Sequence, residues 1–254
     1  MRGVLLGLVV GAIGVAAGCA SPPERRGGLA DRPVVERGVA GTSVEGRPIE
    51  YLAVGPGPEV VLVVATIHGD EPAGTPLLAR LETEYTLDPD LLRGVRLVLV
   101  PLANPDGYAA GTRTNVRGVD LNRNFPSKNF TGTASRGTAP LSEPESLALF
   151  DLVERFEPDR IASFHQPLAC IDWDGPAEDW ARALATTCDL PVKKLGGRPG
   201  SFGSWTGIDL GIPIVTIELP ASSHRRSPES LWADYGELVI AIVRGEAPAH
   251  ASSR

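Results

Sequence analysis

The stretch EVVLVVATIHGDEPAGTPLLARLETEY, residues 59–85, joins an apolar run to a segment with helical spacing. Residues 59–67 are almost continuously apolar, which is typical of a strand covered on both faces of a sheet. Residues 71–85 carry an early proline and leucines at helical spacing, which predict a helix. A buried strand followed directly by a helix is the building unit of a parallel α/β sheet.

The remainder of the chain repeats this alternation of apolar runs and helical segments. Further strands are predicted at residues 47–54, 94–102, 159–164 and 212–219, and further helices at residues 142–156, 177–188 and 228–245. Ser142, with Glu145 three positions later, forms a predicted capping box at the start of one helix. We therefore expect an α/β fold with a mostly parallel sheet and helices on both of its faces.

Composition and charge narrow the class of protein. The chain has 254 residues, of which 43% are hydrophobic and 22% charged, and this suits one α/β domain with a full core. The net charge of -7 argues against a nucleic-acid-binding protein, which needs a basic face. The sequence contains no Lys/Arg-rich run that would form a polybasic membrane patch.

The N-terminal residues have the pattern of an export signal. Residues 1–19 combine a short positive start, an apolar run and small residues before Cys19, and they resemble a lipoprotein signal peptide. The resemblance implies that Cys19 carries a lipid that anchors the mature protein at the periplasmic face of the envelope. A plain secretion signal is the alternative. Residues 20–44 are rich in Pro, Gly, Arg and Ser and predict a flexible tether, with a catalytic domain at residues 45–246 and a disordered tail at 247–254.

Titratable side chains follow three of the predicted strands. His68 and His165 each come directly after a strand, Glu218 closes another, and Glu71 lies in the turn after His68. In open α/β sheets, ligands bind beyond the carboxyl ends of the strands, so these side chains are expected at one rim. Two histidines and one carboxylate, His68, Glu71 and His165, make a three-ligand zinc site with a fourth position for water, and Glu218 is the candidate base. A histidine and a glutamate three positions apart are common by chance, and the alternative is an ordinary turn histidine.

The segment ANPDGYAAGTRTNVRGVDLNRNFP, residues 103–126, resembles the zinc carboxypeptidases. The HGDE motif at 68–71, the later strand-end histidine and the TIEL glutamate follow in the order of that family. The resemblance runs from about Gly41 to the final helix. It implies a mixed, mostly parallel eight-stranded sheet flanked by helices, with one zinc ion per chain. SFHQPLACI, residues 163–171, and PGSFGSWTGIDLGIPIVTIELP, residues 199–220, are similar to murein tripeptide amidases, which cleave between γ-D-glutamate and diaminopimelate.

The resemblance also implies roles for individual residues. His68, Glu71 and His165 would hold zinc, and Asp120 would accept a hydrogen bond from His68 and fix its tautomer. Glu218 would act as general base and then general acid.

Three further residues would contact the substrate. Arg113 would stabilise the oxyanion, while Asn122 and Arg123 would bind the carboxylate of the leaving residue. The resemblance implies a cis peptide bond at Gln166–Pro167. Because the far end of diaminopimelate carries an amine and a carboxylate, we expect a polar pocket, with Ser204, Thr206, Asp209 and Gln166 as candidates.

The expected substrate is a small wall-derived peptide. Typical carboxypeptidases carry a tyrosine before the base glutamate that contacts the substrate carboxylate, but no tyrosine lies between His165 and Glu218. Together with Asn122 and Arg123, the likeness of the SFGSW segment to murein amidases and the export signal, this leads us to expect hydrolysis of L-Ala-γ-D-Glu-diaminopimelate. The alternatives are an N-acyl amino-acid deacylase of the aspartoacylase type, a zinc carboxypeptidase for other small peptides, and a metal-free lipoprotein that binds wall peptides. Cys170 and Cys188 could pair or remain free thiols.

Overall fold

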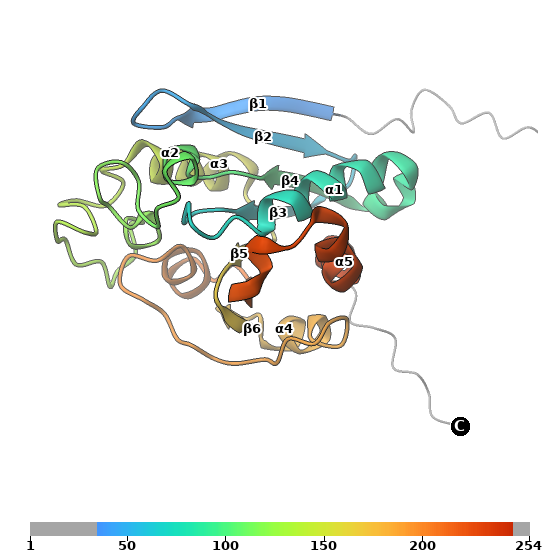
Figure 1. The fold of residues 1–254 in the computed structure, drawn as a ribbon. Helices are drawn as coiled ribbons and strands as arrows, with labels where there is room; N and C mark the ends of the chain where they lie inside the picture. Colours follow the sequence, from blue (N-terminus) through green and yellow to red (C-terminus); the bar gives the residue numbers. More distant parts are fainter. Residues whose placement is uncertain (1–34, 246–254) are drawn as a thin grey trace, which may run out of the picture. The chain divides into compact units, whose positions relative to one another are not determined.

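The computed structural model describes residues 35–245, and the account below concerns that part of the chain (Figure 1). The predicted signal peptide with Cys19, most of the predicted tether and the predicted tail at 247–254 lie outside the described residues. Among the helices at 35–245, none is both long enough and apolar enough to cross a membrane.

A mixed sheet forms the centre of the fold. Within the described residues it has seven strands in the order β1-β2-β4-β3-β5-β7-β6, one fewer than the eight expected. Strands β4, β3, β5 and β7 are parallel to one another, whereas β1 and β2 at one edge and β6 at the other run antiparallel to their neighbours. The strands are β1 (Val35–Thr42), β2 (Pro48–Val54), β3 (Glu59–Ala65), β4 (Val95–Val100), β5 (Arg160–His165), β6 (Leu168–Asp174) and β7 (Ile214–Pro220).

Helices cover both faces of this sheet, as expected. Helices α1 and α5 share one apolar cluster with the sheet, and α3 packs in a second cluster on the opposite face. Figure 1 shows α1 and α5 beside each other, with α4 below α5 and near β6. The helices are α1 (Gly74–Leu87), α2 (Pro105–Ala110), α3 (Pro144–Phe156), α4 (Glu178–Leu184) and α5 (Pro228–Arg244). Short helical turns are η2 (Pro89–Leu92), η3 (Leu121–Arg123), η4 (Ser204–Asp209) and η5 (Ala221–Arg225).

Strand β3 shows why the apolar run forms the centre of the sheet. Val61 and Val63 face the cluster shared with α1 and α5, while Leu62 and Val64 face the cluster shared with α3. All four side chains are buried. Each such side chain contributes about 1.5–3 kcal/mol by leaving water, so a polar residue at either face would be costly.

The edge strands depart from the sequence-based expectations. Residues 35–42 were assigned to the tether but form β1, which pairs along its length with β2. The tether boundary at residue 44 is therefore wrong. The polar and glycine-rich sequence VERGVAGT suits an edge strand, whose side chains stay exposed or half-buried. Strand β6 was not predicted as a strand either.

The start of α3 also differs from the prediction. The helix begins at Pro144, and its N-cap residue is Glu143, which has an extended backbone and makes no side-chain capping bond. Proline fits this first position because its fixed φ suits the helix and it has no N–H to satisfy. The Ser142 hydroxyl donates to Glu143 instead, at 2.9 Å, so the predicted capping box does not form.

Other local expectations can be compared directly with the structure. The Gln166–Pro167 peptide bond is cis, as expected. Cys170 is buried on β6, Cys188 is half-buried, and both are free thiols. Trp205 packs in the core, stacked against Phe150 with ring centroids 5.1 Å apart.

Candidate active site

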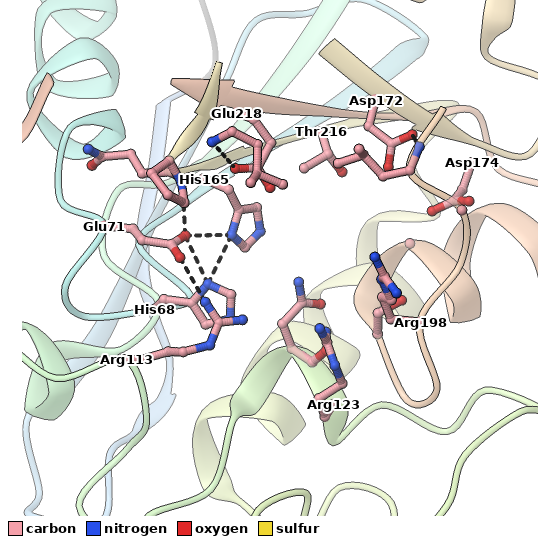
Figure 2. A pocket seen from close by; sticks show the side chains of 18 of the residues that line it. His68, Glu71, Arg113, Arg123, His165, Asp172, Asp174, Arg198, Thr216 and Glu218 are labelled. Atoms are coloured by element: carbon pink, nitrogen blue, oxygen red, sulfur yellow. Dashed lines mark hydrogen bonds and ion pairs between the residues drawn. The ribbon is translucent and has the colours of Figure 1, made fainter. Parts of the chain in front are cut away.

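Two histidines and a glutamate converge at the carboxyl ends of the parallel strands. His165 is the last residue of β5, and His68 and Glu71 lie in the loop after β3, the strand that pairs with β5. The Glu71 Oε2 atom lies 2.9 Å from His68 Nδ1 and 2.9 Å from His165 Nδ1. The two Nδ1 atoms are 3.1 Å apart, and Figure 2 shows the three side chains pointing toward one another.

The spacing of these three atoms fits a zinc ion. One ligand atom from each residue can be chosen so that all lie within 4.8 Å of one another, and all three residues are buried. Ligands about 2.0–2.1 Å from a tetrahedral zinc are about 3.3 Å apart, close to the separations above. Because His68 Nδ1 and His165 Nδ1 face each other at 3.1 Å, their lone pairs would repel unless a proton or a cation lies between them. The donor set therefore fits the zinc ion expected from the sequence.

Asp120 connects the cluster to neighbouring polar side chains. Its Oδ1 accepts from His68 Nε2 at 3.0 Å and from the Asn122 N–H at 3.0 Å. Its Oδ2 accepts from Arg113 Nε at 3.1 Å. Burial alone would raise the pKa of Asp120, but the His68 hydrogen bond and the nearby positive charges lower it. With Asp120 ionised, the proton of His68 is held on Nε2 and the Nδ1 lone pair faces the cluster.

Glu71 is also held in its ionised form. Burial would raise the pKa of the Glu71 carboxyl, but the hydrogen bonds with His165 and His68 outweigh it and lower the pKa. The second oxygen, Oε1, accepts from Arg113 Nη1 at 2.9 Å. The pKa of His68 is raised, because its bonds to Asp120 and Glu71 exceed the opposing effect of burial. Metal binding opposes this shift of His68, because a histidine that holds a metal must be neutral.

The motif NPDGY positions the loop that carries His68. Asn104 accepts from the Gly107 N–H at 2.9 Å at the start of α2, and its amide donates to the Ile67 carbonyl at 3.2 Å. Gly69 lies directly against α2, where an added Cβ would be 1.9 Å from the Gly107 carbonyl carbon. Glycine is required at residue 69 because this close approach leaves no room for a side chain.

Glu218 stands beside the cluster. It pairs with His165 in the register of β5 and β7, and it is 9% exposed. Its Oε2 accepts from the Leu168 N–H at 3.3 Å. Burial raises the pKa of Glu218, and the negative charge of Glu71 acts in the same direction, against the opposing effect of His165. A carboxylate with a raised pKa is suited to accept and return a proton.

A cavity of about 460 Å³ opens in front of these residues. Arg113, Asn122 and Arg123 line it together with His68, Glu71 and His165, the candidate metal-binding cluster. The Asn122 side chain is fixed because its Oδ1 accepts from the Phe202 N–H at 2.8 Å. Burial lowers the pKa of Arg123, and the charges of neighbouring arginines add to this effect. Several arginines therefore line the cavity next to His68, Glu71 and His165.

Three of the four predicted pocket residues lie elsewhere. Only Gln166 lines the cavity. Ser204 donates to the Arg198 carbonyl at 2.8 Å, and Thr206 donates to the Phe202 carbonyl at 2.8 Å, so both hydroxyls stabilise the local chain. Asp209 accepts from the Lys128 N–H at 2.6 Å.

Other polar residues take their place in the cavity wall. The charged and polar residues that the sequence prediction missed include Arg136, Asp172, Asp174, Arg198 and Thr216. The alternation in CIDWD, residues 170–174, is the signal that could have identified two of them, because it predicts a strand with both aspartates on one face.

Comparisons with known proteins agree with this geometry. The zinc carboxypeptidase family model matches residues 30–172, a range that includes His68, Glu71 and His165. Murein peptide amidase A of Escherichia coli (strain K12) is 37% identical over 229 residues, which cover 80% of this chain and 92% of that protein. Murein peptide amidase A of Vibrio campbellii is 35% identical over 210 residues, covering 72% of this chain and 79% of that protein.

Solved structures share the fold. The crystal structure of murein-tripeptide amidase MpaA from Escherichia coli O157 has a TM-score of 0.62 at 29% identity and covers 89% of this chain and 98% of that one. Carboxypeptidase A from Helicoverpa armigera has a TM-score of 0.71 and covers 87% of this chain and 70% of that one, but at 22% identity it shows the fold alone. The fold and the site together define a metal-dependent hydrolase of the metallopeptidase type. The chain belongs to the zinc carboxypeptidase family.

Proposed function

We propose that the protein is a zinc-dependent amidase that hydrolyses the bond between γ-D-glutamate and diaminopimelate in murein tripeptide. The observation that carries this proposal is the cavity itself, in which a carboxylate-binding arginine, Arg123, lies beside the metal-binding cluster and a second group of charged side chains lines the far wall. The relatives named as murein peptide amidases cover most of this chain and support the same substrate.

The residues of the site divide the work of hydrolysis. Zinc, when held by His68, Glu71 and His165, supplies Lewis acidity that polarises the substrate carbonyl and acidifies a water molecule. Glu218 accepts a proton from the attacking water as its oxygen bonds to the carbonyl carbon. It then donates that proton to the diaminopimelate nitrogen as the C–N bond breaks. The products are L-Ala-D-Glu, with a new γ-carboxylate, and free diaminopimelate.

The positive side chains bind and stabilise the reacting groups. Arg113 lies against Glu71 and Asp120, so its guanidinium is directed to the metal-binding cluster, where negative charge develops on the carbonyl oxygen. Asn122 and Arg123 bind the carboxylate next to the cleaved bond. Arginine suits this task because its planar fork can donate two parallel hydrogen bonds to a carboxylate.

A substrate panel separates this proposal from its alternatives. The zinc-loaded protein is incubated with the tripeptide, with acetyl-aspartate and with a peptide that ends in phenylalanine, and the products are separated by chromatography. The amidase proposal predicts fastest cleavage of the tripeptide. Faster cleavage of acetyl-aspartate would support a deacylase, and faster cleavage of the phenylalanine peptide would support an ordinary carboxypeptidase. If a zinc titration shows no binding, the remaining alternative is a metal-free protein that binds wall peptides.

We also propose export and lipid attachment at Cys19, which lies outside the described residues. The positive start, apolar run and small residues before Cys19 support this proposal. Mass spectrometry of the protein from its host would find a diacylglyceryl cysteine at the mature N-terminus. An unmodified N-terminus downstream of Cys19 would favour secretion without an anchor.

A further inference from the structure

The cavity holds more positive charge than one substrate carboxylate requires. Arg123, Arg136 and Arg198 all line it, and none of them forms an ion pair within residues 35–245. Their mutual repulsion is part of what lowers the pKa of Arg123. Arg123 accounts for the carboxylate next to the cleaved bond. The remaining arginines indicate that a second anionic group of the substrate enters the same cavity.

Strand β6 adds two buried carboxylates to the wall of this cavity. Asp172 and Asp174 are two residues apart on the strand and therefore point to the same side. Lys194 Nζ neutralises Asp174 at 2.9 Å. Asp172 accepts from the Leu195 N–H at 2.8 Å and, among the described residues, has no ion-pair partner. A carboxylate that is 6% exposed and faces a cavity is costly to keep charged without a cation, so Asp172 is suited to bind a positive group of the ligand.

The segment SFGSWTG, residues 201–207, packs closely against this wall. An added Cβ at Gly203 would lie 2.4 Å from Asp174 Oδ2, and one at Gly207 would lie 2.6 Å from Asp174 Cβ. The two glycines therefore allow η4 to pack directly against the acidic face of β6. Figure 2 shows Arg198 and Asp174 on the side of the pocket opposite to His68 and Glu71.

We propose that Asp172 and Arg198 form a subsite that recognises the far end of the leaving residue, binding its ammonium and its carboxylate respectively. This inference deepens the proposed function and rests on it. Diaminopimelate carries one amine and one carboxylate at each end. Its near carboxylate binds Asn122 and Arg123, its near nitrogen is in the cleaved bond, and its far end carries a positive and a negative group together. The opposite charges of Asp172 and Arg198 match that pair, whereas an uncharged far end would leave both unpaired.

The test uses three tripeptides that differ only at the far end of the leaving residue. The first ends in diaminopimelate, the second in lysine, which lacks the far carboxylate, and the third in 2-aminopimelate, which lacks the far ammonium. The kcat/KM values of the zinc-loaded protein are compared with those of Asp172→Asn and Arg198→Gln. A hydrogen bond between charged groups changes kcat/KM by about 10- to 100-fold.

The expected result is a crossed pattern of selectivity. Asp172→Asn should lose about 10- to 100-fold with diaminopimelate and with lysine but much less with 2-aminopimelate. Arg198→Gln should lose a similar factor with diaminopimelate and 2-aminopimelate but much less with lysine. Glu178→Gln, an exposed charge change on α4, is the matched control and should leave all three values unchanged.

Zinc content and circular dichroism are measured for every variant, so a misfolded protein is recognised as such. Equal losses with all three tripeptides in folded, zinc-loaded variants would overturn the subsite and leave the amidase proposal intact. A wild-type protein that does not cleave the diaminopimelate tripeptide would overturn both.

Discussion

Replacing Asp120 with asparagine tests how the metal-binding cluster is held together. One carboxylate accepts from His68 Nε2 at 3.0 Å, from the Asn122 N–H at 3.0 Å and from Arg113 Nε at 3.1 Å. Asparagine has the same shape but only one acceptor oxygen. If that oxygen keeps the bonds to His68 and Asn122, the new NH2 group faces the N–H of Arg113, and two donors meet. If the amide is turned, its NH2 group faces His68 instead.

The expected loss of zinc affinity can be estimated from the hydrogen bond to His68 that the substitution weakens. Removing the partner that orients a metal-binding histidine costs about 10- to 100-fold in metal affinity. At 1.4 kcal/mol per tenfold, this corresponds to about 1.4–2.8 kcal/mol. Because the contact of Arg113 with residue 120 is also weakened, leaving Glu71 as its charged partner, we expect kcat to fall further even when zinc saturates the variant.

The assay is a zinc competition against a chelator of known affinity, followed by kinetics at saturating zinc. Asp189→Asn, which removes an exposed carboxylate far from the cluster in sequence, is the control for the change in net charge. Unchanged zinc affinity and unchanged kcat in Asp120→Asn would refute the positioning role of Asp120.

Three further predictions concern the candidate base Glu218, the buried carboxylate of Asp106 and the close packing at Gly69. Glu218→Gln should retain zinc but lose about 10²- to 10⁴-fold in kcat, because the cluster remains while the proton acceptor is gone; near-normal turnover of the zinc-loaded variant would contradict this. Asp106→Asn should lower the free energy of unfolding by about 1–3 kcal/mol at neutral pH, because the Asp106 carboxylate binds Ser43 and the Glu45 N–H in a buried position. These bonds lower the pKa of Asp106 despite its burial, so its contribution is present above its unfolded pKa, about 3.9, and is lost as the pH falls through its lower folded value. Urea unfolding in excess chelator should therefore show the gap between the two proteins narrowing at low pH, and a gap independent of pH would argue against an ionised Asp106. Gly69→Ala should destabilise the protein by about 1–3 kcal/mol in thermal unfolding, because its Cβ overlaps the backbone of Gly107, whereas Gly46→Ala, where an added Cβ meets nothing within 4 Å, tests the cost of a positive φ alone.

The centre of the fold could be predicted from the sequence because burial on both faces leaves a continuous apolar run, as in β3. The edges could not be predicted in the same way. Residues 35–42 remain exposed or half-buried after folding, so their sequence carries little apolar signal, and their strand forms only because β2 offers a free edge. Strand β6 alternates polar and apolar residues because one of its faces forms the wall of the cavity.

Part of the candidate site could likewise be predicted from the sequence, and part could not. His68, His165 and Glu218 could be placed together because each follows or ends a predicted strand, and strand ends meet at one rim. The cavity wall depends on contacts between distant segments, such as the bond from the Phe202 N–H to Asn122 and the bond from the Phe125 N–H to the Gly200 carbonyl. No local sequence pattern indicates such contacts. The sequence therefore led to the prediction that Ser204 and Thr206 line the pocket, whereas their hydroxyls donate to backbone carbonyls.

Isotope labelling of the products tests the proposed reaction most directly. The zinc-loaded protein is incubated with L-Ala-γ-D-Glu-diaminopimelate in water enriched in ¹⁸O, and both products are examined by mass spectrometry. Hydrolysis as proposed places one ¹⁸O atom in the γ-carboxylate of L-Ala-D-Glu and none in diaminopimelate, and a chelator stops the reaction. Release of free alanine, or ¹⁸O in the diaminopimelate, would show that a different bond is cleaved and would contradict the account.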